Sequence, residues 1–102
     1  MTGRLMKFTA HPGQGPELAA LLLRVAESLR GFPGCEVYAI AQDAADPDVV
    51  RVIEVWHTDE AAQSALASPP KDGVPKPADV LALLAAPPER TDLTVLGGVG
   101  IP

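Results

Sequence analysis

The stretch that decides the fold runs from Phe32 to Leu66, FPGCEVYAIAQDAADPDVVRVIEVWHTDEAAQSAL. It contains two runs rich in β-branched and aromatic residues, Cys35–Gln42 and Val49–His57, and each run predicts a strand. The six residues between them include three Asp and one Pro, which favour turns. The stretch therefore predicts a β-hairpin.

Both faces of the second predicted strand are apolar. Because strand side chains alternate between the two faces, one face carries Val50, Val52 and Trp56, and the other carries Val49, Ile53 and Val55. Helices of the same chain can cover one such face, and we expect a second copy of the chain to cover the other. The pattern therefore predicts a homodimer.

Two helices and a strand are expected around the hairpin. A first strand is predicted over Arg4–His11. A helix should begin at Pro16 and stop at Gly31, because Leu and Val recur on one face at helical spacing. Thr58 should cap a second helix, which follows the hairpin at once and ends near Ser68.

The last third of the chain is rich in proline. Residues 69–77 hold four prolines and a glycine, so they predict a loop. A short helix over Ala78–Ala86, a strand over Glu89–Leu96 and a flexible tail over residues 97–102 follow. The element order predicts one α+β domain over residues 1–102, a ferredoxin-like β-α-β-β-α-β sandwich with a four-stranded antiparallel sheet.

Composition excludes several classes of function. A net charge of -5 and a pI near 4.8 argue against nucleic-acid binding, which needs clustered Lys and Arg. Neither a signal peptide nor the run of about 20 apolar residues that a bilayer crossing needs is expected. The single Cys35 cannot form an internal disulfide, which favours the reducing cytoplasm.

Several short motifs resemble the antibiotic biosynthesis monooxygenase domains, a branch of the dimeric α+β barrel superfamily. From Phe8 to Gly98 their order and spacing carry the resemblance. The motifs are Pro12-Gly13, residues 32–38, Asp46-Pro-Asp48, Glu54-Val-Trp56, Asp59-Glu-Ala61 and Leu66-Ala-Ser68.

The resemblance implies a homodimer whose two sheets face each other, with a pocket in each protomer between sheet and helices. It also implies a monooxygenase that acts on a small aromatic substrate, polyketide-like or quinol-like. No metal or flavin is implied, and molecular oxygen is the co-substrate. In such enzymes the ionised substrate itself passes an electron to dioxygen, so the protein supplies deprotonation, orientation and a dry cavity.

The chain departs from the family pattern at two points. Many relatives carry a histidine where this chain has Ala65. The haem-degrading branch uses an asparagine on the first strand, and this chain has no asparagine, so haem degradation is not expected. Ala65 favours an alternative function, a non-catalytic dimeric module that binds a small molecule without converting it.

Five residues are the candidate site. The resemblance transfers Trp56 directly as a pocket wall, and Tyr38 and Leu66 are expected to bind substrate beside it. His57 and His11 are the only imidazoles. The first and third strands are expected to be parallel neighbours, so both histidines should lie at one edge of the sheet, as a base and its partner or as half of a metal site. Trp56, His57 and His11 are thus the predicted catalytic set. Each role has an alternative. Trp56 could be a core anchor, Tyr38 could pack at the dimer interface, and the two histidines could be exposed turn residues.

Two more residues can be interpreted in two ways. Cys35 is interpreted as a small buried hydrophobe rather than a nucleophile, because no histidine is near it in sequence. Glu54, if it points inward, should pair with a cation such as Arg4 or Arg51, since an unpaired buried carboxylate is costly. We expect a structural ion pair there rather than a catalytic acid.

Overall fold

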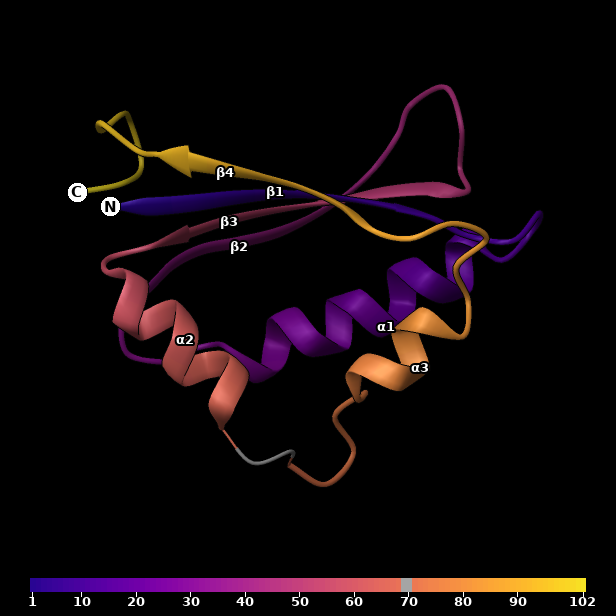
Figure 1. The fold of residues 1–102 in the computed structure, drawn as a ribbon, viewed down its shortest axis with the longest axis horizontal. Coiled ribbons are helices and arrows are strands. Elements are labelled where there is room, and N and C mark those ends of the chain that lie inside the picture. Colours follow the sequence, from indigo (N-terminus) through magenta and orange to yellow (C-terminus); the bar gives the residue numbers. More distant parts are fainter. Residues whose placement is uncertain (69–70) are drawn as a thin grey trace.

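A four-stranded antiparallel sheet carries its helices on one face (Figure 1). The computed structural model describes residues 1–68 and 71–102. The strands are β1 (Thr2–Thr9), β2 (Cys35–Gln42), β3 (Val49–Trp56) and β4 (Glu89–Thr94), and the helices are α1 (Gly15–Ser28), α2 (Asp59–Ala67) and α3 (Pro77–Leu81). The sheet order is β2-β3-β1-β4. This confirms the predicted ferredoxin-like α+β class.

The hairpin loop holds the first helix in place. The Asp48 side chain accepts hydrogen bonds from the backbone N–H groups of Gly13 (3.1 Å) and Gly15 (3.0 Å). Gly15 is required at this point because an added Cβ would lie 1.9 Å from the carbonyl oxygen of Pro47. The turn between β2 and β3 thus caps α1, which has no side-chain cap of its own.

Gly31 and Thr58 act as predicted. Gly31 has a φ of 75° just beyond the end of α1, a conformation that suits glycine. The Thr58 hydroxyl accepts a hydrogen bond from the Ala61 N–H at 3.1 Å and caps α2. The two sequence signals therefore mark a real helix end and a real helix start.

The helix before β4 is shorter than predicted. It spans Pro77–Leu81 instead of Ala78–Ala86, because the backbone beyond it pairs with the end of β1. The His11 N–H donates to the carbonyl of Leu83, and the Ala85 N–H donates to that of Thr9. Part of the predicted proline-rich loop, residues 69–70, lies outside the described residues.

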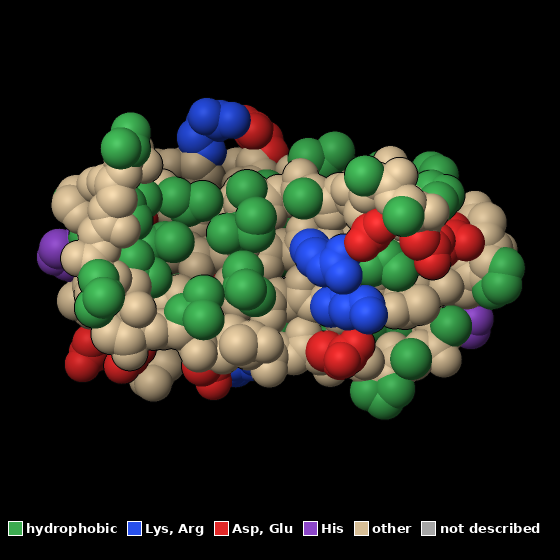
Figure 2. Space-filling view, turned by 90° about the horizontal axis from the view of Figure 1, so that it is seen from above, with side chains coloured by type: hydrophobic (Ala, Val, Ile, Leu, Met, Phe, Trp, Pro, Cys, Tyr) green, Lys and Arg blue, Asp and Glu red, His purple; other side chains and the backbone are tan. Residues whose placement is uncertain are grey.

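The third strand runs antiparallel to the first, so the expectation of a parallel pair is wrong. Helix α1 returns the chain, and the hairpin then reverses it, which places β3 against β1 in the opposite direction. In this register Thr2 lies opposite Trp56, and Thr9 lies opposite Val49. His57, after β3, and His11, after β1, consequently lie at opposite ends of the sheet, as the purple side chains in Figure 2 show.

The helix-facing side of the sheet forms the core. Its buried cluster consists of Ala10, Leu18, Leu22, Val50, Val52 and Val80. Leu18 of α1 and Val50 of β3 have no exposed surface, and each such side chain contributes about 1.5–3 kcal/mol of burial free energy. The core thus joins the hairpin, α1 and α3.

The other face of the sheet is apolar and uncovered in the single chain. Leu5 and Ile53 are each 40% exposed, and Leu93 is 41% exposed. Figure 2 looks onto this face and shows hydrophobic side chains spread over much of it. The predicted second apolar face is therefore present, and what covers it remains a prediction.

Candidate functional site

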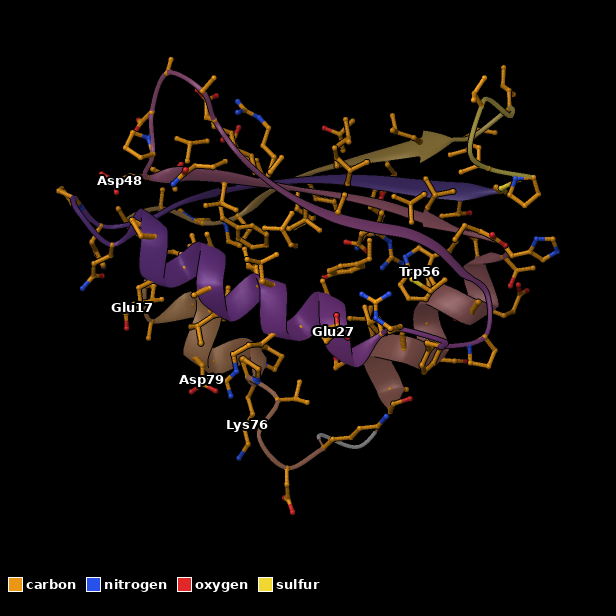
Figure 3. All side chains as sticks on the ribbon, turned by 180° about the vertical axis from the view of Figure 1, so that it is seen from behind. Glu17, Glu27, Asp48, Trp56, Lys76 and Asp79 are labelled. Atoms are coloured by element: carbon orange, nitrogen blue, oxygen red, sulfur yellow. The ribbon has the colours of Figure 1, made fainter. Side chains whose placement is uncertain are left out.

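A buried polar cluster lies near one end of the sheet, on the side that faces the helices. Within the described residues, Arg4 and Glu54 are the buried charged residues, with 9% and 8% exposure. The Trp56 indole N–H donates to Glu54 Oε1 at 3.0 Å, and Arg4 Nη1 lies 4.0 Å from the same oxygen. Figure 3 shows Trp56 between the sheet and the helix layer. The cluster confirms that Glu54 points inward and pairs with Arg4.

The strand register assembles this cluster. Arg4 of β1 is directly opposite Glu54 of β3, and Tyr38 of β2 is opposite Glu54 on the other side. Trp56 follows Glu54 on the same face and meets Phe32 edge-on, with 6.1 Å between ring centroids. Three strands thus bring a cation, a carboxylate, an indole and a phenol together.

Gly34 lets the second helix close over this end of the sheet. Its φ is +84°, and an added Cβ would lie 2.5 Å from the Cβ of Ala61 on α2. Its carbonyl accepts a hydrogen bond from the His57 N–H at 2.8 Å. The start of β2 and the start of α2 are therefore packed tightly beside Trp56.

Tyr38 is a neutral phenol beside this cluster. Burial raises the pKa of the Tyr38 phenol, the negative charge of Glu54 raises it further with a smaller contribution from Cys35, and Arg4 lowers it. The raised pKa keeps the hydroxyl protonated at neutral pH. Glu54 and Arg4 thus both act electrostatically on this phenol.

One donor of the cluster has no acceptor. Arg4 Nε is buried and makes no hydrogen bond within residues 1–68 and 71–102. Leaving a buried donor unpaired costs about 1–3 kcal/mol, and more when the group is charged. The indole N–H of Trp56 is already used by Glu54, so Arg4 Nε is, among the described residues, the fully buried donor of the cluster that is left without a partner.

A cavity of about 260 Å³ lies beside the cluster. It is formed by the end of α1 and the start of β2, and its lining includes Leu29, Tyr38 and the charged Arg30 and Glu36 but none of Arg4, Glu54 and Trp56. Tyr38 belongs to both the cavity and the cluster. A depression of about 310 Å³ lies at Leu81 and Pro87, but apolar residues alone line it, so it offers no group for chemistry. We therefore place the candidate site beside Tyr38.

The structure brings together only some of the predicted site residues. Trp56 and Tyr38 meet in the cluster. His57 is exposed, with Nδ1 3.7 Å from Glu36 Oε1, and His11 is exposed at the far end, so the predicted histidine pair does not form. Leu66 is 73% exposed and lines neither cavity. A role for either histidine alone, or for Leu66, stays a prediction.

Sequence reasoning did not assign Arg4 to the site. It named Arg4 only as one possible partner of Glu54, because the pairing depends on the β1–β3 register. The sequence signal that could have located the cluster was the spacing of Glu54 and Trp56, because residues two apart lie on the same face of a strand. Cys35 is half-buried and lines the cavity, so it is less buried than expected, and burial, followed by the charges of Glu54 and Glu36, raises the pKa of its thiol.

The described residues contain neither a metal-binding cluster nor a membrane-spanning helix. Within the described residues, no group of three or more His, Cys, Asp and Glu side chains is arranged to hold a metal ion. Across residues 1–68 and 71–102, each helix is too short or too polar to span a bilayer.

Fold and cluster together define a small α+β domain of the ferredoxin-like class with a buried charged pair on the helix-facing side of its sheet. The family model for antibiotic biosynthesis monooxygenases matches residues 1–70. The chain belongs to this family. A candidate antibiotic biosynthesis monooxygenase from Chloroflexus aurantiacus J-10-fl has a similar solved structure, with a TM-score of 0.82 and 36% identity over 99% of this chain and 98% of that one.

Two further proteins are similar. SnoaB from Streptomyces nogalater, a cofactor-independent oxygenase, has the same fold, with a TM-score of 0.78 at 22% identity over 96% of this chain and 95% of that one. Protein SchA from Streptomyces halstedii is 41% identical over 59 residues, which are 58% of this chain and 16% of SchA. The match to SchA thus spans a minor part of that protein.

Proposed function

We propose that the protein is a cofactor-independent monooxygenase for a small aromatic substrate, polyketide-like or quinol-like. The observation that carries this proposal is the buried Arg4–Glu54–Trp56 cluster next to a cavity on the helix-facing side of the sheet. Family membership supports the reaction class, and so does the shared fold of SnoaB, which is itself a cofactor-independent oxygenase.

The cavity suits a reaction in which the substrate supplies the electrons. Leu29 and Tyr38 line it together with the charged Arg30 and Glu36, and Trp56 lies on the same side of the sheet. The phenol and the leucine can orient a planar ring, and the charged side chains can bind its polar groups. With an anthrone as substrate, one atom of dioxygen becomes the new carbonyl oxygen. The other atom leaves as water with the two hydrogens of the oxidised carbon.

The proposal includes a homodimer. The outer face of the sheet exposes Leu5, Ile53 and Leu93, and a second copy of this face would bury them. It also includes a reducing compartment such as the cytoplasm, which the free thiol of Cys35 supports.

A non-catalytic binding module is the second candidate. Two observations favour it: Ala65 stands where many relatives carry histidine, and the Trp56 N–H is already bonded to Glu54. In such a module the cavity would hold a ligand without converting it.

Oxygen uptake distinguishes the two functions. Metal-depleted protein is mixed with a panel of hydroquinones and anthrones, and consumption of dioxygen is compared with the uncatalysed rate. The oxygenase predicts uptake with at least one compound and a lower rate for Trp56→Phe. If every compound reacts at its uncatalysed rate but binds, the protein is a binding module.

A further inference from the structure

We propose that Glu54 accepts the proton of a substrate hydroxyl and that Arg4 Nε holds the oxyanion that results. The proposal rests on the proposed function for its substrate class, and it narrows that class to phenols and enols with an acidic hydroxyl. Glu54 would act as the base, and Arg4 would be the residue that binds the charged oxygen.

The unpaired donor of Arg4 points to an oxygen ligand. Its register neighbours are Glu54 on β3 and Asp92 on β4. Glu54 lies at 4.0 Å from Nη1, and Asp92 is exposed and bound to Arg90 at 2.7 Å, so neither carboxylate reaches Nε. A guanidinium N–H that is buried and free recognises an anionic oxygen best, because charge-assisted hydrogen bonds are the strong ones.

The Glu54 carboxylate has one oxygen left for a proton. Both of its contacts, from Trp56 Nε1 and Arg4 Nη1, fall on Oε1, which leaves Oε2 available. The Trp56 hydrogen bond also fixes the orientation of the carboxylate. A base that is held in place and has a free oxygen meets the geometric condition for proton transfer.

The transfer leaves the charge of the cluster unchanged. The substrate O–H bond breaks, its electron pair stays on the oxygen, and the proton forms an O–H bond with Glu54. One negative charge beside the Arg4 guanidinium is thereby exchanged for another, so no new net charge arises in a buried site.

Few charged side chains lie around Arg4. Glu54 faces it from β3, and Asp92 with its partner Arg90 lies on β4. The phenol of Tyr38 and the thiol of Cys35 are the titratable groups that lie beside the cluster on β2. The charged residues of α1 and α2 are all exposed.

The size of the pKa shift that the Arg4 charge can cause determines which hydroxyl groups would ionise in this site. A positive charge within a few ångströms lowers the pKa of an acid by about 1–3 units. A simple phenol ionises near pH 10, as tyrosine does, and would stay mostly neutral even after such a shift. A hydroxyl that is acidified by a conjugated carbonyl or nitro group would ionise.

Binding of 4-nitrophenol without oxygen tests the proposal, because its phenolate is yellow and its neutral form is not. At about pH 6, binding to the wild type should raise the phenolate-to-phenol ratio at least about tenfold, which is one pKa unit. The proton should stay on Glu54, so binding should release none to the buffer. The number of protons released on binding is measured by calorimetry in two buffers of different ionisation enthalpy. 4-Nitroanisole, which lacks the hydroxyl, should bind more weakly.

Variants separate the two roles. Glu54→Gln should retain the yellow phenolate but release about one proton for each probe bound, because the acceptor is gone. Arg4→Met should lose the colour shift. Arg4→Lys keeps the positive charge but lacks the Nε donor, so it should keep only part of the colour shift. This variant tests the role of Arg4 Nε if Arg4→Met does not fold. Arg90→Met, which alters an exposed arginine, is the matched control and should behave as the wild type.

Several results would overturn the assignment. The first is a wild type that does not bind 4-nitrophenol or binds it in the colourless form. The second is equal proton release by the wild type and Glu54→Gln. The third is a phenolate-to-phenol ratio that is unchanged in both Arg4 variants. Oxygen uptake is measured separately. Ionisation without uptake leaves this proposal standing and refutes the oxygenase, whereas uptake without ionisation does the reverse.

Discussion

Arg4 of β1 lies directly across from Glu54 of β3, yet 4.0 Å separates Nη1 from Oε1 although both residues are more than nine-tenths buried. A pair this loose offsets little of the desolvation cost of two charges. Apolar residues of similar size would stabilise the same position at least as well. We therefore interpret the pair as part of a binding site rather than as a source of stability.

Removing one partner of this pair should destabilise the protein. Arg4→Leu leaves the Glu54 carboxylate buried without a cation, so the free energy of unfolding should fall by about 3–5 kcal/mol. Arg4→Leu combined with Glu54→Leu should restore most of the loss, and Arg90→Leu should change stability by less than about 0.5 kcal/mol. Urea denaturation measures all three. A double variant as unstable as the single one would contradict this view of the pair.

The indole N–H of Trp56 should matter more than the size of its ring. Trp56→Phe removes a hydrogen bond to a charged group, so we expect about 2 kcal/mol less stability and at least about tenfold slower turnover. Phe32→Leu is the control, because it removes the edge-on aromatic contact and keeps the N–H. If Phe32→Leu slowed turnover as much as Trp56→Phe, packing rather than the hydrogen bond would be responsible.

Alkaline pH should destabilise the fold through Tyr38. Its pKa is raised in the folded protein, so above its unfolded value of about 10 the folded state binds more protons than the unfolded state. The stabilisation is complete below that pH and is lost as the pH rises toward the folded pKa. Denaturant midpoints between about pH 8 and 11 should fall more steeply for the wild type than for Tyr38→Phe. Parallel curves would argue against a raised pKa.

A charge on the outer sheet face should prevent formation of the proposed dimer. Ile53→Asp places a carboxylate at the centre of the apolar face, and sedimentation at micromolar concentration should then show a monomer. Leu23→Asp is the matched control, because Leu23 is exposed on α1, and the helices lie on the opposite side of the sheet. A wild type that sediments as a folded monomer would refute the dimer itself.

The separated histidines should not act as a pair. His11 and His57 lie at opposite ends of the sheet, so the double variant His11→Ala/His57→Ala should show the product of the two single effects. Because both side chains are exposed, each single variant should change kcat/KM by less than about twofold. A larger effect of His57→Ala alone would give that residue a role beside Trp56.

The sequence by itself determined the local elements. Turn residues between two β-rich runs marked the hairpin, Thr58 marked the start of a helix, and Gly31 marked the end of another, because each signal acts within a few residues of itself. Apolar residues on both strand faces also predicted the uncovered face that carries Ile53. The motifs that resemble the family identified it correctly.

Only the tertiary structure decided which residues meet. Strand direction and register placed Arg4 opposite Glu54 and separated His11 from His57, and backbone pairing with the end of β1 shortened the helix before β4. These outcomes depend on hydrogen bonds between segments dozens of residues apart. Reversing one strand relative to its neighbour changes every pair along it, and no local pattern in the chain carries that information.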